Sequence, residues 1–183
     1  MIAEFVVTIF YGQILVEAPG LPPAALRWDD AHVDQGFAWS PGRVAFGVDD
    51  ADGDSLLRVS VAPDYMLSDE VLWAVQVPFD VPAGSLSIGD VLFPASVDVP
   101  AGRYGLVFSA QSGGGKERPK GAAEHDDGLP NSSEPEPLAY VLDLIFVPAT
   151  EPDFAILRQG DLASASVTRR DTDLIPVPGG AAR

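Results

Sequence analysis

The chain has 183 residues and is 46% hydrophobic, which is enough for one domain with a sizeable core and short for two. Its 27 Asp and Glu against 11 Lys and Arg give a formal net charge of −16, so it repels nucleic acid and anionic membranes and attracts basic surfaces. It contains no cysteine, which excludes disulfides, thiolate metal ligands and a thiol nucleophile.

The compartment is inferred from what the sequence lacks. It has no apolar run of about eighteen residues, the length that a membrane span needs. The first residues, MIAEFVVTIFYG, lack the basic region and the cleavage site of a secretory signal. We therefore expect a cytoplasmic protein with no membrane insertion, and the missing cysteines fit a reducing compartment.

The N-terminal part alternates apolar and polar residues in short runs, which is typical of strands separated by turns. Residues from Ala3 to Glu17 predict one long strand or two short ones that meet at Tyr11-Gly12-Gln13. The one helix signal covers 28–36. Asp29 or Asp30 is placed to cap its first turn and Gly36 to end it. Further strands are predicted at 37–39, 43–48 and 56–62, with a turn at Ser40-Pro41-Gly42 between the first two.

The stretch from Val71 to Ala110 carries the clearest strand pattern. β-Branched and aromatic residues alternate with polar ones, and Pro-Ala-Gly turns at Pro82 and Pro100 each precede a new strand. This pattern predicts neighbouring strands of an antiparallel sheet. The run from Leu138 to Val147 is the most hydrophobic in the chain and predicts a central strand.

Two segments depart from the strand pattern. Gln111 to Pro137 is rich in Gly, Pro, Ser and charged residues, so we expect a flexible insertion between two strands. Residues 151–183 are expected to form a C-terminal extension, with a hairpin around Gln159-Gly160-Asp161 and a frayed end. The predicted fold class is all-β: one antiparallel β-sandwich domain over residues 1–150, with one short helix and the long insertion at 111–137.

No complete catalytic or metal-binding motif is present. The acidic run from Asp49 to Asp54 lacks the glycine and the final glutamate of an EF-hand loop, so it is interpreted as an exposed strand connection, with another kind of calcium site left open. His32 has acidic neighbours but no G-x-S-x-G elbow accompanies it, which favours a surface or packing role. Gly113 to Lys116 lacks the phosphate-loop pattern. We therefore expect no enzyme, no cofactor and no metal.

Alternatives from other classes stay open. A carbohydrate- or small-ligand-binding sandwich would line a groove with Trp28, Trp39 and Trp73, although such aromatics are commonly buried in a small sandwich. A hydrolase would need two convergent carboxylates with perturbed pKa values in a cleft. A structural subunit would expose a large apolar patch or an unpaired edge strand.

A series of short segments in fixed order covers most of residues 5–147. They are Tyr11 to Val16, Trp28-Asp29, Gly36 to Ala38, Val44 to Phe46, Val77 to Phe79, Pro100 to Tyr104 and Tyr140 to Asp143. In this order and spacing they resemble the competence protein J (ComJ) family, whose founding member inhibits the DNA-entry nuclease of a competent bacterium. The insertion and the tail beyond Pro148 depart from the family pattern.

The resemblance implies a non-catalytic inhibitor from bacterial DNA uptake, and its protein partner would be a basic nuclease. The charge leads to the same mechanism independently, because a rigid acidic surface can occupy a cationic groove in place of the nucleic-acid backbone. We expect no direct nucleic-acid binding. The residues expected to meet the partner are Asp29, Asp30 and Asp34 around the helix and Asp49, Asp50, Asp52 and Asp54 in the next connection. For any one of them, an ordinary solvated acid is the alternative.

Overall fold

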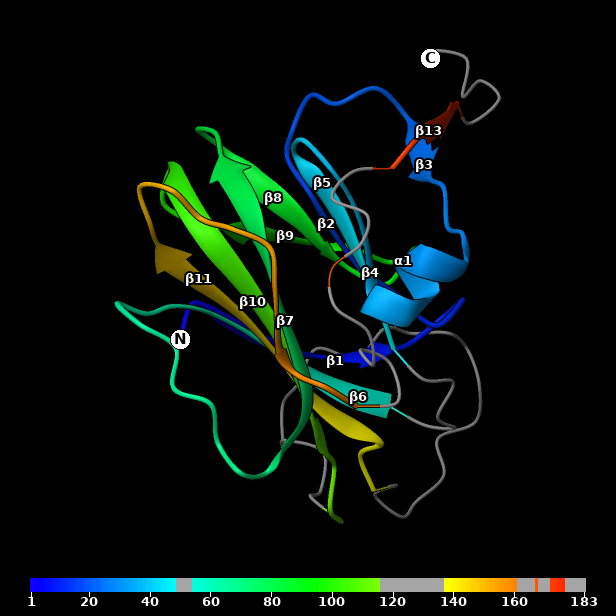
Figure 1. The fold of residues 1–183 in the computed structure, drawn as a ribbon, viewed down its shortest axis with the longest axis vertical. Coiled ribbons are helices and arrows are strands. Elements are labelled where there is room, and N and C mark those ends of the chain that lie inside the picture. Colours follow the sequence, from blue (N-terminus) through cyan, green and yellow to red (C-terminus); the bar gives the residue numbers. More distant parts are fainter. Residues whose placement is uncertain (49–53, 116–136, 161–166, 168–171, 177–183) are drawn as a thin grey trace.

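The structure is a computed structural model that describes residues 1–48, 54–115, 137–160, 167 and 172–176 (Figure 1). A six-stranded sheet contains, from edge to edge, β1 (Ala3–Thr8), β6 (Asp54–Val61), β11 (Tyr140–Pro148), β10 (Gly102–Ser112), β7 (Val71–Val81) and β12 (Ala155–Arg158). A five-stranded sheet contains β4 (Phe37–Ser40), β5 (Arg43–Gly47), β2 (Gln13–Glu17), β8 (Ser85–Gly89) and β9 (Ala95–Asp98). β3 (Ala24–Leu26) pairs with β13 (Leu174–Pro176), and α1 covers Asp30–Gln35.

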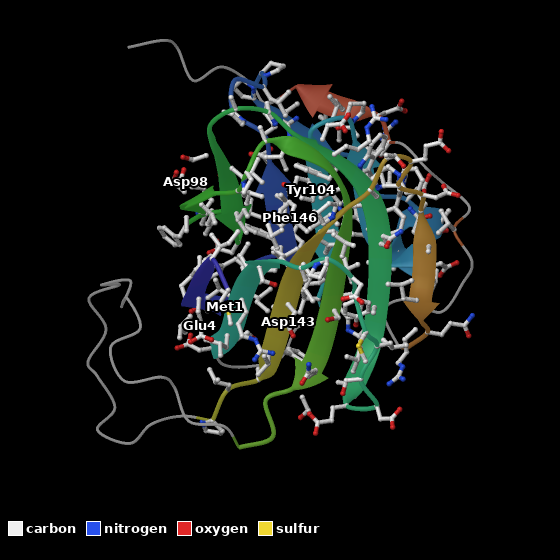
Figure 2. The ribbon with its side chains drawn as sticks, turned by 90° about the vertical axis from the view of Figure 1, so that its left-hand side faces the viewer. Met1, Glu4, Asp98, Tyr104, Asp143 and Phe146 are labelled. Carbon is white, nitrogen blue, oxygen red and sulfur yellow. The ribbon has the colours of Figure 1, made fainter. Side chains whose placement is uncertain are left out.

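The two large sheets pack face to face around one hydrophobic core. Phe46 of β5 stacks on Phe108 of β10 across the interface, with ring centroids 4.6 Å apart, and Trp73 of β7 meets the same Phe108 ring edge-on at 5.1 Å. Within the six-stranded sheet, Tyr104 and Phe146 lie on neighbouring strands and contact edge to face (Figure 2). Alternate residues of each strand enter this core, so the predicted β-sandwich is confirmed.

The predicted strands are present, but strands that the sequence pattern predicted as neighbours in one sheet are divided between the two sheets. The stretch from Val71 to Ala110 forms β7 and β10 in the six-stranded sheet and β8 and β9 in the five-stranded one. β1 and β2 are likewise in different sheets, joined through Tyr11 and Gly12, whose φ angles are +59° and +60°. The β1–β2, β7–β8 and β9–β10 connections therefore cross from one sheet to the other.

Two further details differ from or extend the prediction. β11 is an interior strand as expected, but its pairing with β6 is parallel, so the sheet is mixed. β10 continues through Gln111 and Ser112, which the sequence pattern placed in the insertion. Gly113 to Gly115 and Pro137 are also described, and residues 116–136 of that insertion lie outside the described residues.

The C-terminal segment adds β12 to the edge of the six-stranded sheet and pairs β13 with β3. β12 pairs with β7, and Phe154 just before it contacts Phe37 and Trp39 of β4 at ring distances of 6.0 and 5.2 Å. The second strand of the predicted hairpin lies largely outside the described residues, so that hairpin and the domain boundary at residue 150 stay predictions. In the described part of the chain, no helix is long and apolar enough to cross a membrane.

Candidate functional site

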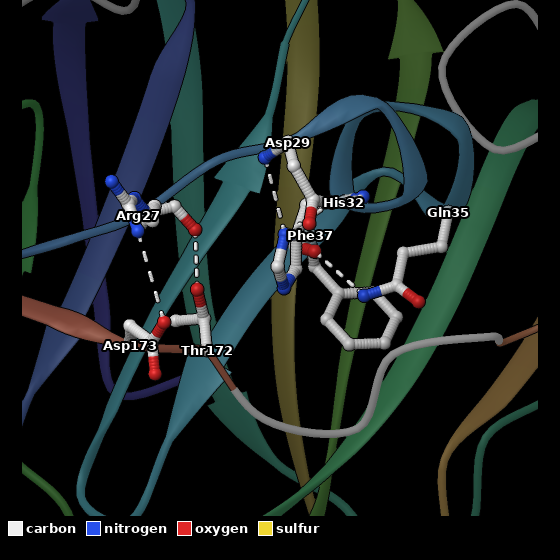
Figure 3. A network of polar contacts seen from close by, with 7 residues as sticks. All are labelled: Arg27, Asp29, His32, Gln35, Phe37, Thr172 and Asp173. Carbon is white, nitrogen blue, oxygen red and sulfur yellow. Dashed lines mark hydrogen bonds and ion pairs between the residues drawn. The ribbon is translucent and has the colours of Figure 1, made fainter.

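Helix α1 is a short, well-capped element whose ends follow from the sequence. The Asp29 side chain accepts a hydrogen bond from the backbone N–H of His32 at 3.2 Å, and the Asp29 N–H donates to Nδ1 of His32 at 3.2 Å (Figure 3). Gly36 ends the helix in the left-handed conformation, with φ +80°. His32 is buried, so its packing role is confirmed and it is not an exposed base.

The segment before the helix is held by the C-terminal residues. The Arg27 N–H donates to the Asp173 carbonyl at 3.0 Å, and the Arg27 guanidinium lies 3.8 Å from the Asp173 carboxylate (Figure 3). The Thr172 hydroxyl donates to the Arg27 carbonyl. Residues more than a hundred positions apart therefore fix the chain where it enters α1, which gives the acidic helix a defined position.

The three acids of the helix region have different roles. Asp29 is the N-cap, so part of its hydrogen-bonding capacity is used to hold the helix. Asp30 and Asp34 are one helical turn apart, share a face of α1 and are exposed to solvent. Neither forms an ion pair within the described residues, so both carboxylates are available to an outside cation.

Asp54 is the one described member of the second predicted acidic group. It begins β6, where its carboxylate accepts a hydrogen bond from the Thr8 hydroxyl at 2.8 Å across the pair of strands. Asp49, Asp50 and Asp52 lie outside the described residues. The chain enters that stretch at Val48, whose N–H donates to the Gly12 carbonyl at 2.8 Å.

Strand register brings the two acidic groups to the same end of the sandwich. The Gly47 N–H donates to the Gly36 carbonyl at 2.9 Å, which joins the C-terminus of α1 to the end of β5. Gln13, the first residue of β2, is opposite Gly47, and Thr8, the last residue of β1, is opposite Asp54. Asp34 and Asp54 therefore both belong to the end that carries the β1–β2 connection.

No arginine in the described structure is paired with Asp30 or Asp34. Every arginine in the described ranges has a carboxylate partner elsewhere: the pairs are Arg27–Asp173, Arg43–Glu17, Arg58–Asp143, Arg103–Asp80 and Arg158–Asp69. The remaining basic residues of the sequence fall outside the described ranges. The exposed Asp30 and Asp34 consequently keep their attraction for a basic surface.

Exposed apolar residues occupy the same end, and the sequence analysis did not single them out. Phe10 and Tyr11 lie in the β1–β2 connection, and Val91, Leu92 and Phe93 lie in the β8–β9 loop. The rings of Phe10 and Phe93 contact edge to face, with centroids 6.2 Å apart. In the sequence they are marked by the Tyr11-Gly12 turn and by the loop from Asp90 to Pro94. Both carry large apolar residues at positions where turns are usually polar.

The residues of a sugar-binding groove are not assembled. Trp73 is buried in the core, and Trp39 donates its indole N–H to the Pro78 carbonyl at 2.8 Å. Trp28 packs against a separate small cluster beside the five-stranded sheet. The three tryptophans therefore do not form one exposed aromatic platform. Among the described residues, no three His, Asp or Glu side chains are grouped to hold a metal ion.

A cavity of about 220 Å³ lies against the outer face of the six-stranded sheet, beside the loop that follows β6. Tyr65 and Asp64 of this loop line it, together with Ser109 and Asp143 of the sheet. Burial raises the pKa of the Tyr65 hydroxyl above 10.0, the neighbouring Asp143 carboxylate raises it further, and Ser109 and Arg158 oppose the increase. Asp143 is held by Arg58, so the cavity does not present two free carboxylates of a hydrolase.

A family profile and a solved structure match this chain. The sequence profile of competence protein J (ComJ) matches residues 6–145, which is most of the chain. The search of curated proteins found no match to this chain. The fold is similar to the crystal structure of ComJ, inhibitor of the DNA degrading activity of NucA, from Bacillus subtilis, with a TM-score of 0.54 and 20% sequence identity over 80% of this chain and 99% of that one. The resemblance in the ordered segments is thus confirmed, and the chain belongs to the competence protein J (ComJ) family.

Proposed function

We propose that this protein is a non-catalytic, acidic inhibitor that binds a basic DNA-entry-type nuclease and blocks the groove in which the nuclease holds nucleic acid. The observation that carries the proposal is family membership over residues 6–145, because the B. subtilis ComJ of similar fold inhibits the DNA degrading activity of NucA. The net charge of −16 supports the same partner, since a nuclease must present positive charge to phosphates.

The proposed contact surface is acidic and rigid. Asp30 and Asp34 project from a helix that is capped at both ends, and Asp54 lies on a paired strand. Fixed carboxylates of this kind can take the place of backbone phosphates with little loss of conformational entropy on binding. Asp49, Asp50 and Asp52 precede Asp54 in the sequence and are part of the proposal, and Asp29 contributes by holding α1.

The first experiment follows plasmid degradation by purified NucA, or by its counterpart from the organism of this chain. Divalent metal is kept in large excess, so that chelation by carboxylates does not imitate inhibition. We expect a several-fold molar excess of this protein to suppress cleavage. Undiminished cleavage, with no complex detected at low salt, would remove the inhibitor proposal for that nuclease and favour a small-ligand-binding sandwich, for which the cavity beside Tyr65 is the place to look.

The second experiment tests the acids with a charge-matched control. The site variant combines Asp30→Asn, Asp34→Asn and Asp54→Asn, and leaves the cap at Asp29 intact. The control combines Asp64→Asn, Glu70→Gln and Glu151→Gln, three exposed acids outside both acidic groups. Both variants change the net charge equally, so a larger loss of inhibition in the site variant locates the contact. Equal losses would mean that only the total charge matters.

A further inference from the structure

Two loops at the acidic end of the sandwich display large apolar side chains to solvent. We call Phe10, Tyr11, Val91, Leu92 and Phe93 together the apolar tip. Tyr11 is 76% exposed, and Leu92 and Phe93 are 49% and 48% exposed. Large aromatic and aliphatic side chains gathered on a surface in this way are characteristic of a protein interface and not of an ordinary solvated turn.

The β8–β9 loop is built to hold its apolar residues outward. The Asp90 side chain is buried, and its carboxylate accepts hydrogen bonds from the backbone N–H groups of Leu92 at 2.6 Å and Phe93 at 3.0 Å. Gly89 adopts φ +145°, and a Cβ there would lie 3.2 Å from the Pro94 Cα. A buried carboxylate and a position restricted to glycine thus fix a loop whose exposed side chains contribute little to the core.

The β1–β2 connection holds Tyr11 in a conformation that tyrosine disfavours. Its φ is +59°, in the left-handed region, and it is the one non-glycine residue with positive φ in the described part of the chain. The strain is not offset by burial, because most of the tyrosine side chain is in solvent. Asn or Gly would fit this turn better. The side chain therefore does not serve the folding of the isolated chain.

The apolar tip shares its end of the sandwich with Asp34 and Asp54. Asp54 is joined to Thr8 at the end of β1, immediately before this connection, and Gly12 is hydrogen-bonded to Val48. Every described arginine pairs with a carboxylate that belongs to neither loop. The surface thus combines an apolar centre with negative charge beside it, which is complementary to a cationic surface that contains an apolar recess.

We propose, on the basis of the proposed function, that the apolar tip is the short-range anchor of the nuclease complex and inserts into an apolar recess beside the basic groove. The acids and the tip then have separate roles. Asp30, Asp34 and Asp54 attract the nuclease over distance and set the salt-dependent association rate. The tip is desolvated only in the final complex and sets the dissociation rate.

The variants are chosen so that folding is preserved. Tyr11→Asn removes the aromatic ring and places a residue that tolerates the left-handed conformation, so the melting temperature is expected to stay the same or rise by about 2–4 °C. Leu92→Ser and Phe93→Ser leave the backbone bonds to Asp90 in place. The matched control is Leu174→Ser, which changes a side chain that is 44% exposed on β13, beside β3 and away from β1 (Figure 1).

The measurement is surface plasmon resonance against immobilised NucA, or its counterpart from the same organism, over a range of salt concentrations. We expect Tyr11→Asn and the Leu92→Ser/Phe93→Ser variant to weaken the complex roughly thirtyfold, as removal of interface hot spots does. The loss should lie in the dissociation rate, and the salt dependence of association should not change. Leu174→Ser should bind like the wild type.

The outcomes separate this inference from the proposed function. If the wild-type protein does not bind or inhibit the nuclease, the proposed function fails and the inference fails with it. If the wild type binds and the tip variants dissociate as slowly as it does, only the inference is overturned. A wild-type dimer in light scattering that Tyr11→Asn dissociates, with nuclease affinity unchanged, would assign the tip to self-association and also overturn it.

Discussion

Arg58 of β6 and Asp143 of β11 form a bidentate ion pair across the parallel strands of the six-stranded sheet. The guanidinium Nε donates to one carboxylate oxygen at 2.7 Å and an Nη donates to the other at 2.8 Å. The two residues are opposite each other in the strand register and both are partly buried. This pairing explains how a carboxylate is accommodated in the middle of the most hydrophobic run of the chain.

The first prediction concerns this pair. Asp143→Ala is expected to lower the free energy of unfolding by about 1.5–3 kcal/mol, because it leaves a partly buried guanidinium without its charged partner. The exposed pair Arg103–Asp80 is the control, and its loss should cost about 1 kcal/mol or less. Urea unfolding of the single and double variants gives the coupling energy of each pair. Equal couplings would show that partial burial adds nothing to the Arg58–Asp143 pair.

The second prediction concerns the core. Leu144 is fully buried on β11, an interior strand of the six-stranded sheet. Leu144→Ala is expected to cost about 2–5 kcal/mol, because truncation leaves a cavity that the rigid sheets cannot fill. The free energy of unfolding in urea measures this cost. A loss below about half a kcal/mol, as at exposed sites, would contradict the assignment of this strand to the core.

The third prediction concerns pH. The Tyr65 hydroxyl is buried beside Ser109 without a hydrogen bond of normal geometry in the described structure, and burial raises the pKa of Tyr65 above 10.0. The folded protein therefore holds this proton when the unfolded chain has begun to lose it. The contribution of Tyr65 to stability is fully present below pH 10 and is lost as pH rises through the folded pKa.

Melting temperatures of the wild type and of Tyr65→Phe between pH 8 and about 11.5 test the assignment. The wild type should lose stability more steeply than the variant above about pH 10, where a tyrosine hydroxyl of the unfolded chain ionises. Below that pH, the phenylalanine variant should be as stable as the wild type or slightly more stable, since it removes a buried polar group. Parallel curves across the whole range would rule out a raised pKa at Tyr65.

The fourth prediction concerns the insertion. Replacement of residues 116–136 by a short Gly-containing turn is expected to change the melting temperature little, because loop-closure entropy varies slowly with length. The replacement begins after Gly113, which must stay glycine because a Cβ there would lie 1.7 Å from the Leu138 carbonyl oxygen. A large loss of stability in differential scanning calorimetry would show that the polar composition of this segment conceals a packed element.

The sequence predicted local structure better than it predicted pairing. Alternation and turn residues locate the strands, and the caps Asp29 and Gly36 locate α1, because these signals act within a few residues. The parallel pairing of β11 with β6 depends on contacts such as Arg58 with Asp143, 85 residues apart, which no local pattern contains. Tertiary contacts also decide which turn crosses between the sheets.

For the candidate site, too, the sequence shows which residues are present and the structure shows how they are arranged. Its acids are visible in the sequence, which offers Asp29 or Asp30 as the cap, and the structure shows that Asp29 is the cap while Asp30 and Asp34 face solvent. The apolar tip requires strand register to bring the β1–β2 and β8–β9 connections together, because Phe10 and Phe93 are far apart in the sequence. Tyr11 is recognised through its backbone angle, which its residue type does not suggest.

Competition with DNA tests the central claim most directly. A short fluorescent duplex is bound to the nuclease in metal-free buffer, in which it is not cut, and this protein is added while the anisotropy of the DNA is followed. If the inhibitor occupies the nucleic-acid groove, the anisotropy falls to the value of free DNA near one equivalent of inhibitor, and the midpoint moves to higher inhibitor concentrations as salt rises. An anisotropy that stays constant, or rises because a ternary complex forms, would contradict groove blocking.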